Sequence, residues 1–305
     1  MTTMTALLKR TIDSLREAIG QPIRLRHLID DHPDIRIDLN TPTNSIALRD
    51  VVRWDELDSE FRLSRRSVGS LLGWRLHGRH YSSFNVKRPE FDSFGNTSRD
   101  DAFTCDIRSV QGLSEAKSDL SKYSSMDQWI EAESPELITP LTQDQLAKNL
   151  AHREIRVGCE LGSDYFCRDA WDGRLFLVNT GGAHHFGAAR YIATRIDQPV
   201  ELRAPLYVRS INRTAVESLR KDFEIFMLPE AHDISNEFHD VMGTMGVTWL
   251  WHGLPHPFKD CRAVYLPRSE AKSMQVAVEL RAAGVADLGG HWSMLLSNQS
   301  RFKLA

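Results

Sequence analysis

The segment from Leu175 to Arg190 joins an apolar strand to a helix through a double glycine, and it constrains the fold more than any other part of the chain. Residues 175–178 are apolar and of strand-forming types, and Gly181-Gly182 then breaks the run. The small residues at 187–189 allow the helix that follows to pack closely on a sheet. Free backbone N–H groups and the positive end of the helix dipole meet at such a helix start, so the segment predicts an anion-binding turn.

Composition places the chain among globular proteins. Its 305 residues are 41% hydrophobic and 26% charged, unlike disordered or fibrous sequences. The net charge of −3 does not support a strong electrostatic grip on DNA, although DNA stays open as a partner. The four cysteines include no Cys-x-x-Cys pair, which favours free thiols over a disulfide scaffold or a zinc site. The first 15 residues are neither a signal peptide nor a membrane span, so we expect a cytoplasmic protein that does not bind membranes. No residue is assigned as a metal ligand.

Helical and strand patterns alternate along the chain, which predicts a mixed α/β or α+β fold. Expected helices lie at 5–19, 63–76, 113–132, 142–152, 184–194, 214–222, 234–242 and 270–283. Expected strands lie at 22–29, 34–39, 45–54, 105–110, 155–159, 165–167, 175–179, 200–202, 206–208, 224–228, 247–251 and 262–266. The polar stretch 80–104 is expected to be a long loop.

These elements suggest three consecutive parts. Residues 1–133 form an N-terminal α/β region that carries the long polar loop, and Ser134-Pro135 marks its end. Residues 134–228 form a core around the double-glycine turn. Residues 229–305 form a C-terminal α/β addition that is expected to pack on that core.

From 142 to 206, roughly a fifth of the chain, the order of residue types resembles the ParB-like and sulfiredoxin-like superfamily. Members have a short helix, then a hairpin whose second strand runs through paired glycines and a histidine into a helix with paired alanines. The corresponding residues here are Asp172-Gly173 in the hairpin, Gly181-Gly182, His184, Ala188-Ala189 and, later, Gln198-Pro199-Val200. The resemblance implies a ParB/sulfiredoxin-like core at 134–228.

Two positions depart from the superfamily pattern. Ala183 stands where sulfiredoxins have their nucleophilic cysteine, which argues against thiol-dependent reduction of a sulfinic acid. His185 stands where an arginine usually contacts phosphate, and a neutral imidazole lacks the fixed fork of donors of a guanidinium. Arg190, roughly one turn further along the helix, is the candidate to substitute for it.

The resemblance implies a protein of a bacterium or mobile genetic element that binds a nucleotide, CTP or ATP with Mg²⁺, in DNA maintenance, transfer or defence. The residues expected to contact the nucleotide or its phosphate are Gly181, Gly182, His184, His185 and Arg190. The sequence leaves open whether the protein is an enzyme, and no catalytic residue is assigned. Glu160 and Asp164, just upstream of the hairpin, are the candidates for a carboxylate near the phosphates.

Two other functions stay open at this point. The chain could be a non-enzymatic interaction module with a degenerate nucleotide site, in which Trp251–Phe258 or the stretch 80–104 binds a partner protein. It could also be a metal-dependent nuclease that depends on Glu160 or Asp164.

One further group of residues carries candidate chemistry. Histidine and aspartate pairs at 232–233 and 239–240 share one short helix, but Asn236 takes the position that would complete a ligand set on the same face. Trp249 and Trp251 are spaced so that they share one face of a strand, which suits packing in a core or at an interface.

Overall fold

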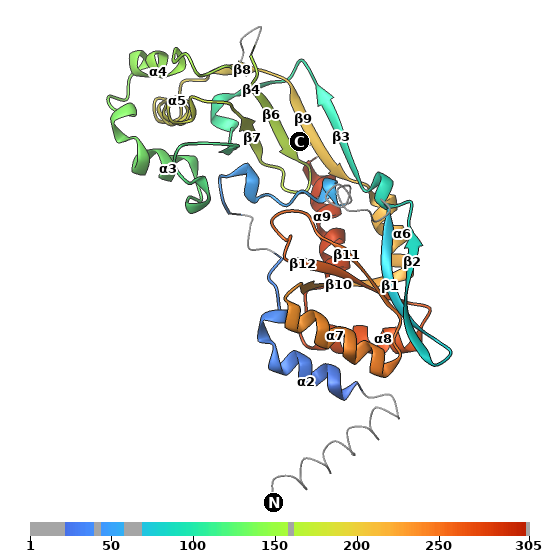
Figure 1. The fold of residues 1–305 in the computed structure, drawn as a ribbon. Coiled ribbons are helices and arrows are strands. Elements are labelled where there is room, and N and C mark those ends of the chain that lie inside the picture. Colours follow the sequence, from blue (N-terminus) through green and yellow to red (C-terminus); the bar gives the residue numbers. More distant parts are fainter. Residues whose placement is uncertain (1–21, 40–43, 58–68, 158–161, 303–305) are drawn as a thin grey trace, which may run out of the picture. The chain divides into compact units, whose positions relative to one another are not determined.

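The computed structural model describes residues 22–39, 44–57, 69–157 and 162–302 (Figure 1). The helix expected at 5–19 lies outside the described residues. The chain forms two compact units. The first unit is drawn from the described residues of 1–39, 56–94 and 212–294, and the second unit from those of 40–55, 95–211 and 295–305. The three parts expected from the sequence follow chain order, whereas these two units are interleaved along the chain.

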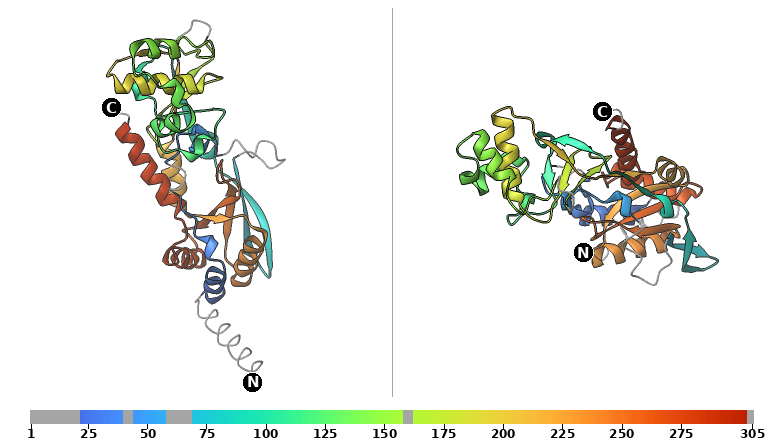
Figure 2. Two further views of the ribbon diagram at one scale, coloured as in Figure 1. Left: turned by 90° about the vertical axis from the view of Figure 1, so that its left-hand side faces the viewer. Right: turned by 90° about the horizontal axis from the view of Figure 1, so that it is seen from above.

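The first unit is built on a five-stranded antiparallel sheet. Its strand order is β10 (Phe223–Pro229), β12 (Cys261–Pro267), β11 (Trp249–Gly253), β1 (Ser70–His77) and β2 (His80–Lys87). Helices α2 (Ile23–Asp31), α7 (His232–Met245) and α8 (Ala271–Ala282) lie together on one side of this sheet (Figures 1 and 2). Helix α6 (Arg213–Asp222) leads directly into β10. Leu28, Phe238 and Val264 are among the buried side chains that join the three helices to the sheet.

The second unit holds a mixed sheet and a group of helices. The order of its strands is β3 (Gly95–Asp100), β9 (Leu206–Ile211), β6 (Tyr165–Asp169), β7 (Leu175–Val178) and β5 (Gly112–Leu113), and β4 (Thr104–Asp106) pairs separately with β8 (Glu201–Arg203). Helices α3 (Met126–Glu133), α4 (Gln143–Leu150) and α5 (Ala183–Arg195) lie together beside this sheet (Figure 1). Trp129 and Phe186 are buried where α3 and α5 meet. The last described helix is α9 (Leu288–Phe302).

The mixed α+β class is confirmed, because both units combine helices with sheets. The elements expected between 142 and 152 and from 165 to 283 are present, with bounds that differ by a few residues. Their apolar runs are bounded by glycine, proline and capping residues, such as Thr142 before α4 and Asn212 before α6. These are local signals that do not depend on distant pairing.

Several expectations for the first 133 residues were wrong. Residues 22–29 form most of helix α2 instead of a strand, and the described part of the expected helix 63–76 belongs to strand β1. The expected strands at 34–39 and 45–54 contain short 3₁₀ turns instead, and Ala47 forms an isolated parallel bridge with Leu113. The expected helix at 113–132 is limited to α3, which begins at Met126.

The expected loop at 80–104 was also wrong, because it contains strands β2 and β3. Most of their side chains are exposed or half-buried, so no alternating apolar pattern marks them in the sequence. Their stability comes from backbone pairing with β1 and β9, which depends on the fold and not on local residue types.

A buried ion pair joins two strands of the second unit. Asp169 on β6 lies opposite Arg209 on the parallel strand β9. The Arg209 Nε atom is 2.6 Å from Asp169 Oδ1, and an Nη atom donates to Oδ2 at 2.7 Å. The Asp169 side chain is 0% exposed and that of Arg209 6% exposed, so both charges have left water.

No helix in the described part of the chain combines the length and the apolar character needed to cross a membrane.

Candidate functional site

The turn between β7 and α5 borders a cavity of about 900 Å³ within the second unit. Its lining comes from residues 115–118, 133–134, 136–137, 152, 154, 156 and 179–185. A cavity of this volume falls within the range of small-molecule sites. Four of the five residues expected to contact phosphate, Gly181, Gly182, His184 and His185, belong to this lining.

The backbone conformation of the turn explains why its second glycine, Gly182, is a glycine. Gly182 precedes α5 with φ +66°, a left-handed conformation that favours glycine. A Cβ atom at Gly182 would also approach the backbone carbon of Glu154 to 3.0 Å. The first hydrogen bond of α5 runs from the Phe186 N–H to the Gly182 carbonyl. Among the described residues, no acceptor is found for the amide N–H groups of residues 183–185, which leaves three donors at the positive end of the helix.

A carboxylate of the chain itself already occupies part of this turn. Glu154 Oε2 accepts a hydrogen bond from the Gly182 N–H at 3.2 Å. Glu154 is exposed, so its side chain can leave the turn without breaking the core. Sequence reasoning missed Glu154 because it lies 28 positions before Gly182, and no local signal marks the contact.

His184 is held by a chain of hydrogen bonds. The Ser134 hydroxyl donates its single proton to the Glu133 carbonyl oxygen at 2.7 Å, so it accepts from His184 Nδ1, also at 2.7 Å. This places the proton of the neutral imidazole on Nδ1. The Nε2 atom is buried, and no partner for it occurs among the described residues. The ring lies against Trp129, with centroids 4.9 Å apart.

His185 is held in a similar way by an amide. The Asn149 side chain donates to the Leu137 carbonyl at 2.9 Å, and its oxygen accepts from His185 Nδ1 at 3.0 Å. The imidazole of His185 stacks on that of His152, with centroids 3.8 Å apart and planes 13° from parallel. Two rings stacked this closely disfavour a positive charge on both.

We expect both histidines to be neutral at pH 7. Burial lowers the pKa of His184, and burial with a smaller effect of His152 lowers the pKa of His185. The unfolded chain therefore binds more protons than the folded one below about pH 6.5, so the free energy of unfolding falls as the pH is lowered through that range. NMR titration of the two imidazoles should give midpoints below 6.5. Midpoints at or above 6.5 would contradict this account of the site.

The charged groups around the cavity are mixed. The Arg156 guanidinium contacts the Thr180 hydroxyl at 3.3 Å, and Lys117 is exposed, with no partner for its ammonium group among the described residues. The carboxylates of the lining are Glu115, Glu133, Glu136 and Glu154. Carboxylates thus outnumber the two permanent cations, so an anion that arrives with a divalent cation fits the cavity better than a bare anion.

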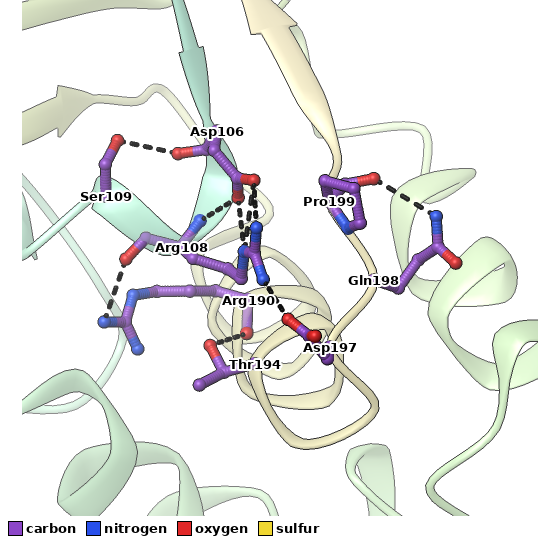
Figure 3. A network of polar contacts seen from close by, with 8 residues as sticks. All are labelled: Asp106, Arg108, Ser109, Arg190, Thr194, Asp197, Gln198 and Pro199. Carbon is purple, nitrogen blue, oxygen red and sulfur yellow. Dashed lines mark hydrogen bonds and ion pairs between the residues drawn. The ribbon is translucent and has the colours of Figure 1, made fainter.

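Arg190 lies outside the cavity lining. It donates to the Val110 carbonyl at 2.6 Å and to Asp127 at 2.7 Å, and Figure 3 shows it beside the backbone of Arg108. Five residues along a helix correspond to a rotation of about 140°, so Arg190 projects from a different face of α5 than His185. Its guanidinium therefore fixes α5 to the segment after β4 and does not replace the arginine missing at position 185.

The two candidate carboxylates have different positions. Glu160 lies outside the described residues. Asp164 is 3% exposed and accepts hydrogen bonds from the Thr180 N–H and hydroxyl and from the Arg156 N–H, at 3.1 to 3.2 Å. These bonds occupy both carboxylate oxygens of Asp164, which therefore positions the turn.

Comparison with known proteins places this region in a family. The chain belongs to DUF6685, a family of unknown function whose model matches residues 100–304. No curated protein and no solved structure matches the chain. The matched region contains the whole lining of the cavity, whereas β1 and β2 lie outside it.

Proposed function

We propose that this member of the DUF6685 family binds a nucleotide, CTP or ATP with Mg²⁺, in the cavity at the start of α5. The observation that carries the proposal is the row of three unused amide donors at residues 183–185, at the positive end of a 13-residue helix and on the wall of a nucleotide-sized cavity. The resemblance to the ParB-like and sulfiredoxin-like superfamily supports the same ligand. In this proposal the protein acts in the cytoplasm of a bacterium, or for a mobile element, in DNA maintenance, transfer or defence.

The cavity suggests how a phosphate group would bind. The phosphate oxygens accept from the amides of residues 183–185 and displace the Glu154 carboxylate from Gly182. Lys117 and Arg156 supply positive charge at the cavity wall, and Mg²⁺ offsets the surplus of carboxylates. His184 and His185 shape the wall with neutral rings, and Ser134 and Asn149 hold these rings in place through their Nδ1 atoms.

Calorimetric titration tests this proposal. CTP, ATP and GTP are added to the full chain with and without Mg²⁺. We expect saturable heat for at least one nucleotide, and tighter binding with Mg²⁺ than without it. A folded sample that gives no heat with any of the three would rule out the nucleotide site.

Replacing Glu154 by glutamine should tighten nucleotide binding about fivefold. Glutamine keeps an oxygen for the Gly182 N–H but removes a negative charge that competes with phosphate, an effect of about 1 kcal/mol at an exposed position. Calorimetry on Glu154→Gln and on the control Glu201→Gln measures the difference. Glu201 is exposed on β8 and lies outside the cavity lining, so its variant should bind like the wild type.

The bond between Glu154 and Gly182 also favours a second candidate, a non-enzymatic interaction module whose nucleotide site is degenerate. In this version the carboxylate replaces the ligand permanently. If neither the wild type nor Glu154→Gln binds nucleotide, that result favours this candidate. Binding by Glu154→Gln alone would assign Glu154 the role of an internal competitor in a site that keeps its other contacts.

A further inference from the structure

A second cavity, of about 450 Å³, lies in the first unit between the sheet and helix α7. Its floor is aromatic. Trp74 on β1 lies directly opposite Trp249 on β11, and Leu72 lies opposite Trp251, so the four side chains share one face of the sheet. Trp74 and Trp251 are half-buried and keep part of their ring surface open.

Helix α7 presents a polar stripe to this floor. The cavity is lined by His232, Ser235, Asn236 and His239, which recur at helical spacing and therefore share one side of α7. The neighbouring side of the helix carries Ile234, Phe238, Val241 and Met242, which are buried in the core. His232 and Asn236 are exposed, whereas Ser235 and His239 are half-buried beside the tryptophans, so the stripe offers polar groups to a ligand with hydrogen-bonding edges.

Two of these polar groups have unused hydrogen-bonding capacity. The Ser235 hydroxyl oxygen is buried and has no hydrogen-bond partner among the described residues. The Asn236 amide nitrogen is 3.0 Å from His232 Nε2, and no described residue contacts the amide oxygen. A buried hydroxyl without a partner costs free energy, which a ligand that bonds to it recovers.

The charges at the cavity cancel. Glu230 pairs with Arg262 at 2.9 Å, and the Arg262 guanidinium lies over the Trp251 ring, 4.8 Å from its centroid. An isolated anion or quaternary ammonium group would therefore meet no net opposite charge. On the helix side, the His239 ring meets Trp74 edge-on, with centroids 4.5 Å apart. Aromatic surface thus comes from both the sheet and the helix.

We propose that this cavity binds a nucleobase. A nucleobase is uncharged and flat, has two π faces for stacking, and carries donors and acceptors on its edge that match the stripe on α7. A sugar ring offers only one apolar face and is a poorer match for aromatic groups on two sides. The base could belong to a free nucleoside or to a single-stranded nucleic acid. This site lies in the first unit and does not depend on the proposed nucleotide cavity of the second unit.

The probe for the test is 2-aminopurine riboside, a fluorescent nucleoside that carries no phosphate, added to the full chain. One parallel arm uses a short single-stranded oligonucleotide that contains the same base, and others use methyl glucoside and choline as competitors. We expect saturable quenching of the probe and no competition by the sugar or by choline. Tighter binding of the oligonucleotide identifies a strand as the source of the base, and equal binding identifies a free nucleoside.

Variants locate the site. Trp251→Leu should weaken binding of the riboside about tenfold or more through lost stacking, and Asn236→Ala about threefold through a lost hydrogen bond. Asn236 is exposed, so its variant keeps the fold. Gln275→Ala, which removes an exposed amide on α8 outside this cavity, should bind like the wild type, as should Lys117→Met/Arg156→Met in the second unit. Absence of quenching, equal binding by all variants, or displacement by the sugar or choline would overturn the proposal.

Discussion

Replacing Arg209 by methionine is expected to lower the free energy of unfolding by about 3–5 kcal/mol, the usual cost of breaking a buried ion pair. Methionine fills much of the space but leaves the Asp169 carboxylate, which is 0% exposed, without its partner. Urea unfolding of the wild type and the variant measures the loss. Arg203→Met, at an exposed position on β8, is the matched control and should change stability by less than about 0.5 kcal/mol.

The pH dependence of this loss gives a second readout. Burial raises the pKa of the Asp169 carboxyl, and Arg209 opposes that rise. Without Arg209 the folded-state pKa rises further, so the folded chain holds a proton that the unfolded chain releases. The loss of stability should then be larger at pH 8 than at pH 5. Asp169→Leu/Arg209→Met, which removes both charges, should recover most of the stability. A loss below about 1 kcal/mol in the single variant would contradict the structural role of the pair.

The second large effect is expected at the cavity of the second unit. Lys117→Met/Arg156→Met should weaken nucleotide binding about 30- to 100-fold, because it removes both permanent cations of the lining. Each exposed charge-assisted contact to phosphate is worth about 1 to 1.5 kcal/mol here, and every 1.4 kcal/mol is a factor of ten in affinity.

Calorimetry on this double variant needs a control with the same change in net charge. Lys148→Met/Arg203→Met removes one lysine and one arginine of the same unit from exposed positions outside the cavity lining. It should bind nucleotide with nearly the affinity of the wild type. Equal weakening by both double variants would mean that the overall charge of the protein, and not the cavity, governs binding.

The sequence predicts the surroundings of the candidate site well because their signals are local. The β6–β7 hairpin, the turn at Gly181-Gly182 and helix α5 follow from an apolar run, turn residues and small helical residues that are adjacent in the chain. The left-handed conformation of Gly182 is the kind of backbone that a paired glycine predicts.

The contacts that complete the site depend on distant segments. Glu154 reaches Gly182, Ser134 reaches His184 and Asn149 reaches His185 only because α3, α4 and α5 pack together. Distance along the chain alone places Arg190 near the site. It takes no account of the rotation of the helix between positions 185 and 190, which turns Arg190 to another face.

The same distinction explains the errors near the N-terminus. Leu71, Leu72 and Leu76 have a spacing that fits a helix, but these residues lie on strand β1 between β11 and β2. Leu71 is buried, whereas Leu76 is 48% exposed at the end of the strand. The difference in exposure between Leu71 and Leu76 depends on where each residue lies in the sheet, and the spacing of apolar residues in the sequence does not encode that position.

Backbone NMR during a titration with ATP and Mg²⁺ tests the central claim most directly, because it reports on the amide groups themselves. The account predicts that the N–H resonances of Gly182, Ala183, His184 and His185 shift together and saturate, while those of the exposed Lys148 and Arg203 stay in place. The opposite result is a folded sample in which the resonances at the start of α5 stay unchanged, even at nucleotide concentrations that saturate binding elsewhere on the protein. That result would contradict the claim that the nucleotide binds at this helix start.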